Sequence, residues 1–197
     1  MIKGVIFDAD GTLLDSMGFW TSTVYDIISL AGITEPEQGL IDTLNPMSMV
    51  DGAIYLKQKY NIKANAEDNI AEENKRVLSF YNSEVTLRPG MGELVRYLRQ
   101  NDIPMAVATA TEGYMIKAAL RHTGILENFV KVISCSDVGV GKDKPDVFLA
   151  ACDAIGLYPE DVLVLEDSPV AIETAKGAGF MTLNVTDTDD ILSSLVL

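Results

Sequence analysis

Residues 2–13 read Ile2-Lys3-Gly4-Val5-Ile6-Phe7-Asp8-Ala9-Asp10-Gly11-Thr12-Leu13, and this stretch decides the fold. Its first half is short, apolar and rich in β-branched residues, which is typical of a strand buried on both faces. Two carboxylates, Asp8 and Asp10, follow at once, and Gly11 permits a turn. The stretch therefore predicts an α/β protein with acidic groups at the carboxyl end of its first strand.

The rest of the α/β pattern lies beyond residue 88. Four further apolar segments predict strands, and each follows a segment of helical periodicity: strands at 103–108, 130–134, 162–165 and 180–185, and helices at 91–100, 112–122, 146–155 and 169–176. A short helix is also expected after Asp187. This alternation predicts right-handed crossovers and a mostly parallel sheet with helices on both faces.

The residues between these two parts have a helical pattern only. From Ser16 apolar residues recur at helical spacing, and Gly32 is placed to end this helix. Asn45 before Pro46 is typical of a helix start, and a further amphipathic helix is expected from about Asn65. We therefore expect a small all-helical cap domain, residues 16–82, inserted into a core domain formed by residues 1–15 and 83–197. Segments near 13–17 and 82–89 would then serve as hinges.

Composition excludes several classes of protein. The formal net charge is −14, with an estimated pI of 4.3, so nucleic acid and anionic membranes are not expected partners. The two cysteines, Cys135 and Cys152, make neither a disulfide framework nor a zinc-ligand pattern. The start of the chain lacks the longer apolar stretch of a secretory signal, so we expect a cytoplasmic protein, as a monomer or weak homo-oligomer.

Chemically active side chains follow the predicted strands. Carboxylates, a hydroxyl and a lysine occupy these places: Asp8, Asp10, Thr109, Lys142, Glu166 and Asp167. Because the carboxyl ends of parallel strands meet at one edge of a sheet, these groups should lie together. Each motif alone has a structural explanation, such as a capped turn or a solvated lysine, but their occurrence at successive strand ends favours catalysis.

The chemistry that fits this set is phosphoryl transfer. Mg²⁺ prefers oxygen ligands, which Asp8 and Asp167 can supply, with Glu166 as a further candidate. Asp8 would attack phosphorus, and Asp10 would protonate the leaving oxygen and then activate water. The phosphate would be bound by Lys142, Thr109 and neighbouring backbone N–H groups such as that of Ala110. Thr111 is expected to cap the following helix.

Four segments together carry a family resemblance: 7–13 (FDADGTL), 107–111 (VATAT), 141–146 (GKDKPD) and 165–168 (LEDS). With these motifs the chain resembles the haloacid dehalogenase-like hydrolase superfamily, in its phosphatase and β-phosphoglucomutase-like branch. The resemblance spans nearly the whole chain and implies a Rossmann-like core with a helical cap, a Mg²⁺ cofactor and an aspartyl-phosphate on Asp8. It also implies that the backbone carbonyl of Asp10 is a metal ligand.

Departures from the family pattern raise two questions. Asp143 stands where the family commonly has a proline, so the spacing favours Lys142 as the phosphate-binding lysine but leaves Lys144 open. Trp20 stands near the place where β-phosphoglucomutases usually carry a histidine. Because an indole cannot titrate, this favours a hydrolase over a mutase.

Other conspicuous residues have ordinary interpretations. His122 suits the end of a helix, and the cap lysines Lys57 and Lys75 suit solvated faces. Three methionines, Met17, Met47 and Met49, are interpreted as core residues rather than pocket lining.

The sequence thus predicts a Mg²⁺-dependent phosphatase that acts on a small phosphomonoester, such as a sugar phosphate or a nucleotide-like metabolite. A phosphomutase is the alternative. A dehalogenase would leave Asp10 and Asp167 without a task, and a non-enzymatic phospho-receiver or metal-binding module would not need a cap.

Overall fold

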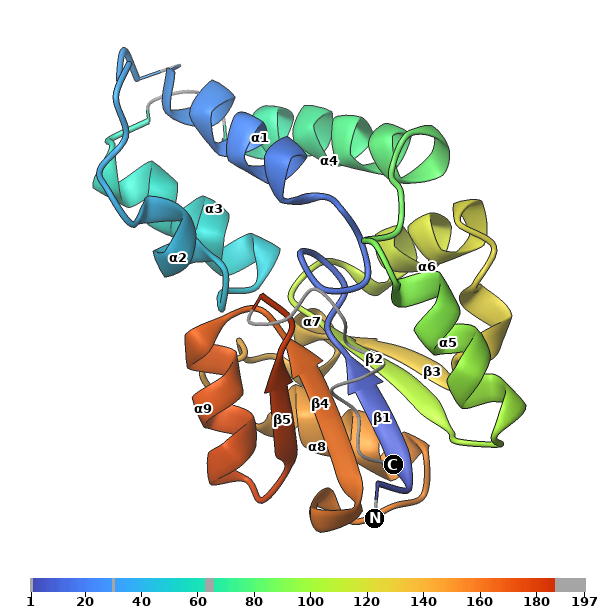
Figure 1. Ribbon diagram of the computed structural model, residues 1–197. Helices are drawn as coiled ribbons and strands as arrows, with labels where there is room; N and C mark the ends of the chain where they lie inside the picture. The colour runs from blue at the N-terminus through green and yellow to red at the C-terminus, as the bar shows by residue number, and fades with distance from the viewer. Residues whose placement is uncertain (1, 30, 63–65, 187–197) are drawn as a thin grey trace.

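The computed structural model describes residues 2–29, 31–62 and 66–186. Five strands form one parallel sheet in the order β3-β2-β1-β4-β5 (Figure 1). The strands are β1 (Gly4–Phe7), β2 (Met105–Thr109), β3 (Lys131–Ser134), β4 (Val162–Glu166) and β5 (Met181–Asn184). β1 is central, and a strand pairs with it on each side. The fold is therefore the α/β class that the sequence predicts.

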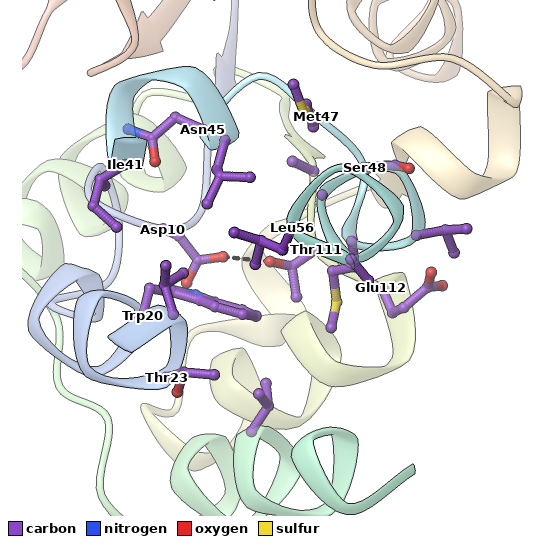
Figure 2. Close-up of a pocket in the computed structure, with 18 of the residues that line it drawn as sticks. Asp10, Trp20, Thr23, Ile41, Asn45, Met47, Ser48, Leu56, Thr111 and Glu112 are labelled. Atoms are coloured by element: carbon purple, nitrogen blue, oxygen red, sulfur yellow. Dashed lines mark hydrogen bonds between the residues drawn. The ribbon is translucent and has the colours of Figure 1, made fainter. Parts of the chain in front are cut away.

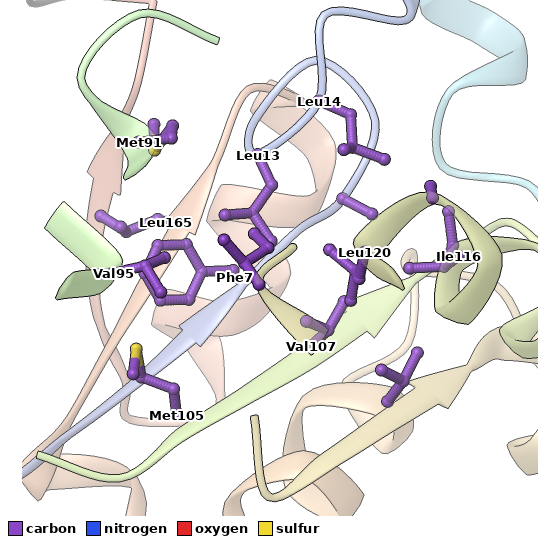
Figure 3. Close-up of a cluster of buried hydrophobic side chains, with 14 of the residues drawn as sticks. Phe7, Leu13, Leu14, Met91, Val95, Met105, Val107, Ile116, Leu120 and Leu165 are labelled. Carbon is purple, nitrogen blue, oxygen red and sulfur yellow. The ribbon is translucent and has the colours of Figure 1, made fainter. Parts of the chain in front are cut away.

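Helices cover both faces of the sheet. On one face α5 (Met91–Gln100) and α6 (Gly113–His122) pack against Phe7, Val107 and Leu165 (Figure 3). On the other face α8 (Asp146–Ala154) and α9 (Pro169–Gly177) pack against Ile6 and the alternate residues of β2 and β4. Side chains of a strand alternate between its faces, so both sets of β1 residues are buried, which explains its unbroken apolar sequence.

Strand register brings the carboxyl ends together. Phe7 is paired with Val107 on β2 and with Leu165 on β4, so the residues after these three strands leave the sheet at the same edge. The loops that follow carry Asp8, Ala110 and Asp167.

Four helices lie beyond this edge (Figure 1). They are α1 (Met17–Ser29), α2 (Leu40–Leu44), α3 (Met49–Lys59) and α4 (Ala66–Ser83). α1, α2 and α3 share a small apolar cluster of their own, whose fully buried members include Ile28, Leu40 and Leu56. α4 belongs instead to the large cluster on the α5–α6 face of the sheet, through Val77 and Tyr81.

Two crossing segments connect these helices to the sheet, and they are bonded to each other. The Asp15 N–H donates to the Thr86 carbonyl, and the Arg88 N–H donates to the Leu13 carbonyl, each at 2.9 Å. These bonds form around an antiparallel bridge between Leu14 and Leu87. The two crossing points are therefore fixed relative to one another.

The helix start expected at Asn45 is wrong. Asn45 ends the short helix α2, which the sequence did not suggest, and α3 begins after Ser48, whose hydroxyl accepts the Asp51 N–H. A serine followed three residues later by a carboxylate is a stronger N-cap signal than Asn-Pro, because both partners bond reciprocally.

Smaller elements also went unforeseen. They are the four-residue helix α7 (Cys135–Val138) and two 3₁₀ turns, η1 (Leu126–Asn128) and η2 (Pro159–Asp161). His122 ends α6, as expected. The helix expected after Asp187 lies outside the described residues. Within the described ranges, no helix combines the length and apolar character that crossing a membrane requires.

Candidate active site

Asp8 lies directly after β1 and is almost fully buried. Its Oδ1 accepts a short hydrogen bond from the Lys142 ammonium, which also donates to Glu166 Oε2 at 2.7 Å. Lys142 is only 1% exposed, whereas Lys144 is exposed and lies 3.9 Å from Asp143. The structure therefore brings Lys142, rather than Lys144, to Asp8.

Burial controls the protonation of this cluster. Burial and the neighbouring Glu166 carboxylate raise the pKa of Asp8 to about 7, despite the opposing effect of Lys142. Burial likewise raises the pKa of Glu166. Burial alone would lower the pKa of Lys142, but Asp8 and Glu166 outweigh it and raise that pKa well above its usual value. Lys142 is thus a permanent cation between two carboxyl groups.

Asp167 completes an acidic group at the end of β4. Oxygen atoms of Asp8, Glu166 and Asp167 lie within 4.8 Å of one another. Burial and the charge of Asp8 raise the pKa of Asp167 to about 6. Gly11, in the left-handed region at φ 81°, passes so close to the Asp167 carboxylate that a Cβ at this position would collide with it. The turn after β1 is therefore shaped around Asp167.

Asp10 is held by hydroxyl groups rather than by contacts with the cluster of Asp8, Glu166 and Asp167. Its Oδ1 accepts from Ser16 at 2.6 Å and, in a short hydrogen bond, from Tyr81. Its Oδ2 accepts from Thr111 at 2.8 Å (Figure 2). Tyr81 in turn accepts the Trp20 indole N–H at 3.0 Å. The carboxylate of Asp10 is thus fixed by donors from three separate parts of the chain.

Thr109 ends β2, and Ala110 and Thr111 begin the loop between β2 and α6. The buried Thr109 hydroxyl accepts the Thr111 N–H at 3.1 Å, while Ala110 and Thr111 line the cavity at this end of the sheet. The expectation that Thr111 caps α6 is wrong. The N-cap residue is Glu112, which makes no side-chain cap bond, and the Thr111 hydroxyl is directed to Asp10 instead.

A cavity of about 520 Å³ extends from these residues into the helices beyond the sheet. Its floor contains Asp8, Asp10, Lys142, Glu166 and Asp167, and its walls come from α1, α2, α3 and α4. The assignment of Met17, Met47 and Met49 to the core rather than to a pocket is wrong in that all three line this cavity, although Met49 also packs against the large apolar cluster. Helical spacing alone does not distinguish a buried face from one that borders a cavity.

Sequence reasoning missed the tyrosine that contacts Asp10. Tyr81 lies on the apolar face of α4, where its spacing is typical of a core residue, and it is indeed fully buried. A buried tyrosine normally requires a partner for its hydroxyl, and that requirement was the available signal. The identity of the partner, 71 positions away in the sequence, follows only from the fold.

Comparison with known proteins agrees with this geometry. The family model of the haloacid dehalogenase-like hydrolases matches residues 2–179. A (DL)-glycerol-3-phosphatase of Arabidopsis thaliana is 31% identical, over 99% of this chain and 88% of its own length. A probable pseudouridine-5'-phosphatase of Drosophila melanogaster is 29% identical, over 92% of this chain and 80% of its own. A phosphorylated carbohydrates phosphatase of Thermotoga maritima is 28% identical, over 90% and 82%.

Solved structures share the fold. A β-phosphoglucomutase from Clostridium difficile superposes with a TM-score of 0.81 at 21% identity, over 93% of this chain and 84% of that chain. CbbY from Rhodobacter sphaeroides, in complex with phosphate, gives a TM-score of 0.77 at 24% identity, over 92% and 85%. At these identities the likeness establishes the arrangement of the chain alone.

Proposed function

The chain belongs to the haloacid dehalogenase-like hydrolase family, and from this premise we propose that it hydrolyses small phosphomonoesters through a phosphoryl group carried on Asp8. Its relatives are named phosphatases, which makes it a phosphoric monoester hydrolase. The state of its second carboxylate oxygen supports the role of Asp8 as the nucleophile. Oδ2 is buried and has no hydrogen-bond partner among the described residues, while Oδ1 is held by Lys142.

In the first step, Asp8 Oδ2 attacks phosphorus. The bond between phosphorus and the ester oxygen breaks, and the leaving oxygen takes a proton from Asp10. Lys142 and the backbone N–H groups near Ala110 bind the phosphate oxygens and offset their negative charge. The fixed orientation of Asp10 supports its assignment, because proton transfer requires a donor held within hydrogen-bond reach.

In the second step, Asp10 removes a proton from a water molecule, whose oxygen attacks the phosphorus of the aspartyl-phosphate. The bond from phosphorus to Asp8 breaks, and inorganic phosphate leaves. Asp8 is then a carboxylate and Asp10 is protonated again, so the two steps together consume one water and one ester.

The residues around Asp8 fit a divalent cation. Three carboxyl groups, those of Asp8, Glu166 and Asp167, face the one ammonium of Lys142, so negative charge is in excess when all are ionised. Mg²⁺ would be held by Asp8 and Asp167, with Glu166 and the backbone carbonyl of Asp10 as further ligands. When bound, it would neutralise negative charge on the phosphoryl group.

We also assign residues 16–82, which hold α1, α2, α3 and all of α4 but its last residue, to a cap over a core formed by residues 1–15 and 83–197. The separate apolar cluster of α1, α2 and α3 supports this division for those three helices, whereas Val77 and Tyr81 of α4 pack in the large cluster of the core. The pairing of the two crossing segments near Leu14 and Leu87 supports the boundary itself. A cap of this kind would exclude bulk water from the ester.

Phosphate release from a generic aryl phosphate tests this proposal. We expect release that requires Mg²⁺ and is lost in the Asp8→Asn variant. Product analysis with a sugar phosphate tests the phosphomutase alternative: release of inorganic phosphate supports the hydrolase, and a rearranged sugar phosphate without release contradicts it.

A further inference from the structure

Apolar side chains dominate the wall of the cavity opposite the carboxylates. We define the apolar wall by six residues of α1, α2 and α3: Trp20, Val24, Ile27, Leu44, Ile54 and Leu56. A cavity of about 520 Å³ lies within the range of roughly 300–1,000 Å³ that is usual for small-molecule sites. Trp20 of this wall donates its indole N–H to Tyr81, which in turn donates to Asp10, so the wall begins next to the catalytic groups.

Few polar side chains interrupt the helical part of the lining. They are Thr23, Asn45, Ser48, Lys57 and Asn74. The Ser48 hydroxyl is already engaged with Asp51, and Lys57 is exposed. Thr23 is 2% exposed, and its hydroxyl has no hydrogen-bond partner among the described residues. Besides the Thr23 hydroxyl, the side-chain amides of Asn45 and Asn74 therefore supply the polar groups of this lining, which is otherwise apolar.

Helix α3 presents apolar side chains that nothing in the described chain covers fully. Val50 is 57% exposed and Ile54 is 48% exposed, one helical turn apart, and both line the cavity. Exposed apolar side chains that border a cavity are characteristic of ligand sites, where the ligand removes them from water.

The two sides of the cavity are in contact as the structure stands. The backbone N–H of Lys142 donates to the backbone carbonyl of Pro46 at 2.9 Å. This bond joins the loop between α2 and α3 to the loop that contains Lys142. A Cβ on Gly141 would lie 2.7 Å from the same carbonyl, so a glycine is required for this approach. The apolar wall and the carboxylates therefore bound a single space.

From these observations we propose that the phosphoester hydrolysed here has a mainly apolar leaving group, a ring or branched alkyl body, rather than a polyhydroxylated sugar. The inference rests on the proposed phosphatase function and specifies its substrate class. Sugar hydroxyls placed against the apolar wall would lose their hydrogen bonds to water without replacement, whereas an apolar body gains from burial.

The test compares two esters that release primary alcohols and carry six-membered rings, cyclohexylmethyl phosphate and glucose 6-phosphate. With Mg²⁺ present, we expect kcat/KM for cyclohexylmethyl phosphate to be at least about 100-fold higher, since each group mismatched to an apolar pocket changes kcat/KM by about 10-fold or more. Equal or higher kcat/KM for glucose 6-phosphate overturns the substrate class but leaves the phosphatase intact. Absence of phosphate release from both esters and from an aryl phosphate overturns the proposed function and this inference with it.

A variant locates the preference in the apolar wall. Ile54→Asn places an amide at a half-exposed position of the wall. We expect this variant to lower kcat/KM for cyclohexylmethyl phosphate about 10-fold and to keep kcat/KM for glucose 6-phosphate within about threefold of the wild-type value. The matched control is Leu149→Asn, at an exposed position of α8 outside the cavity, which should change neither value. A loss of the same size on both esters in Ile54→Asn contradicts a role of this wall in selection.

Discussion

The carboxyl edge of the sheet and the apolar wall face each other across one cavity, but they are built differently. At the edge, Asp8, Lys142 and Glu166 are at most 5% exposed and are fixed by bonds to one another. On the wall, Ile54 is half exposed, and Val24, Leu44 and Leu56 are placed by the packing of α1, α2 and α3 against one another. The bonded residues of the sheet edge are suited to holding the catalytic groups in one arrangement. The side chains of the wall can be replaced without disturbing that arrangement.

The largest effect should come from removing the carboxylate that attacks phosphorus. We expect Asp8→Asn to lower kcat at least about 1,000-fold, because an amide is a poor nucleophile toward phosphorus. Lys142 keeps Glu166 as a partner, so the thermal unfolding midpoint should change little. Steady-state phosphate release and thermal unfolding measure the two effects, with Asp153→Asn on α8 as the control. Retention of wild-type kcat in Asp8→Asn would remove the basis of the mechanism.

Lys142→Met should lower both the phosphatase activity and the free energy of unfolding. Loss of the ammonium leaves buried carboxylates together, which costs about 3–5 kcal/mol when one partner of a buried pair is removed. Activity should fall about 100-fold or more, because a charge that stabilises the transferring phosphoryl group is gone. Urea unfolding and phosphate release provide the measurements.

Two further variants sharpen the lysine test. Lys144→Met, at the exposed neighbouring lysine, should behave as wild type. The double variant Lys142→Met with Glu166→Gln should recover part of the lost stability, since one uncompensated carboxyl group is removed. A double variant as unstable as Lys142→Met alone would show that charge imbalance is not the cause.

Tyr81→Phe probes the connection between the two regions, because Tyr81 accepts the indole N–H of Trp20 on the wall and donates to Asp10 at the sheet edge. Loss of this hydroxyl should lower kcat about 10-fold and change KM less than about threefold, as expected for a residue that positions the acid–base group. The control is Tyr97→Phe, at an exposed position of α5. A rise in KM at constant kcat would assign Tyr81 to substrate binding instead.

The smallest expected effect is the pH dependence of stabilisation by Mg²⁺. The pKa of Asp8 is raised from 3.8 to about 7, so between these values the folded chain binds more protons than the unfolded chain. The stability of the metal-free protein therefore falls as pH rises through this range. Mg²⁺ competes with those protons, and we expect it to raise Tm by several degrees at about pH 8 and by less than half as much at about pH 5.5. An equal shift at both values would contradict binding at these carboxylates.

The two regions also differ in how far the sequence could reveal them. The apolar run before Asp8 and the strand-ending residues Thr109 and Glu166 placed the sheet and its edge correctly, because strand burial and parallel topology leave few alternatives. α2 was missed, since a five-residue helix has too few positions to show a period. The cavity-lining position of Met47 and the bond from Tyr81 to Asp10 could not be predicted, because the contacts of a helix face depend on packing that local spacing does not encode.

Trapping the phosphorylated chain tests the central claim most directly. During a single turnover with excess protein, acid quenching before the intermediate is hydrolysed, followed by borohydride reduction, converts an aspartyl-phosphate to homoserine, which peptide mass spectrometry locates. We predict homoserine at position 8, and none in Asp8→Asn. Homoserine at Asp10 or Asp167, or product formed in that turnover with no homoserine at all, would contradict the account.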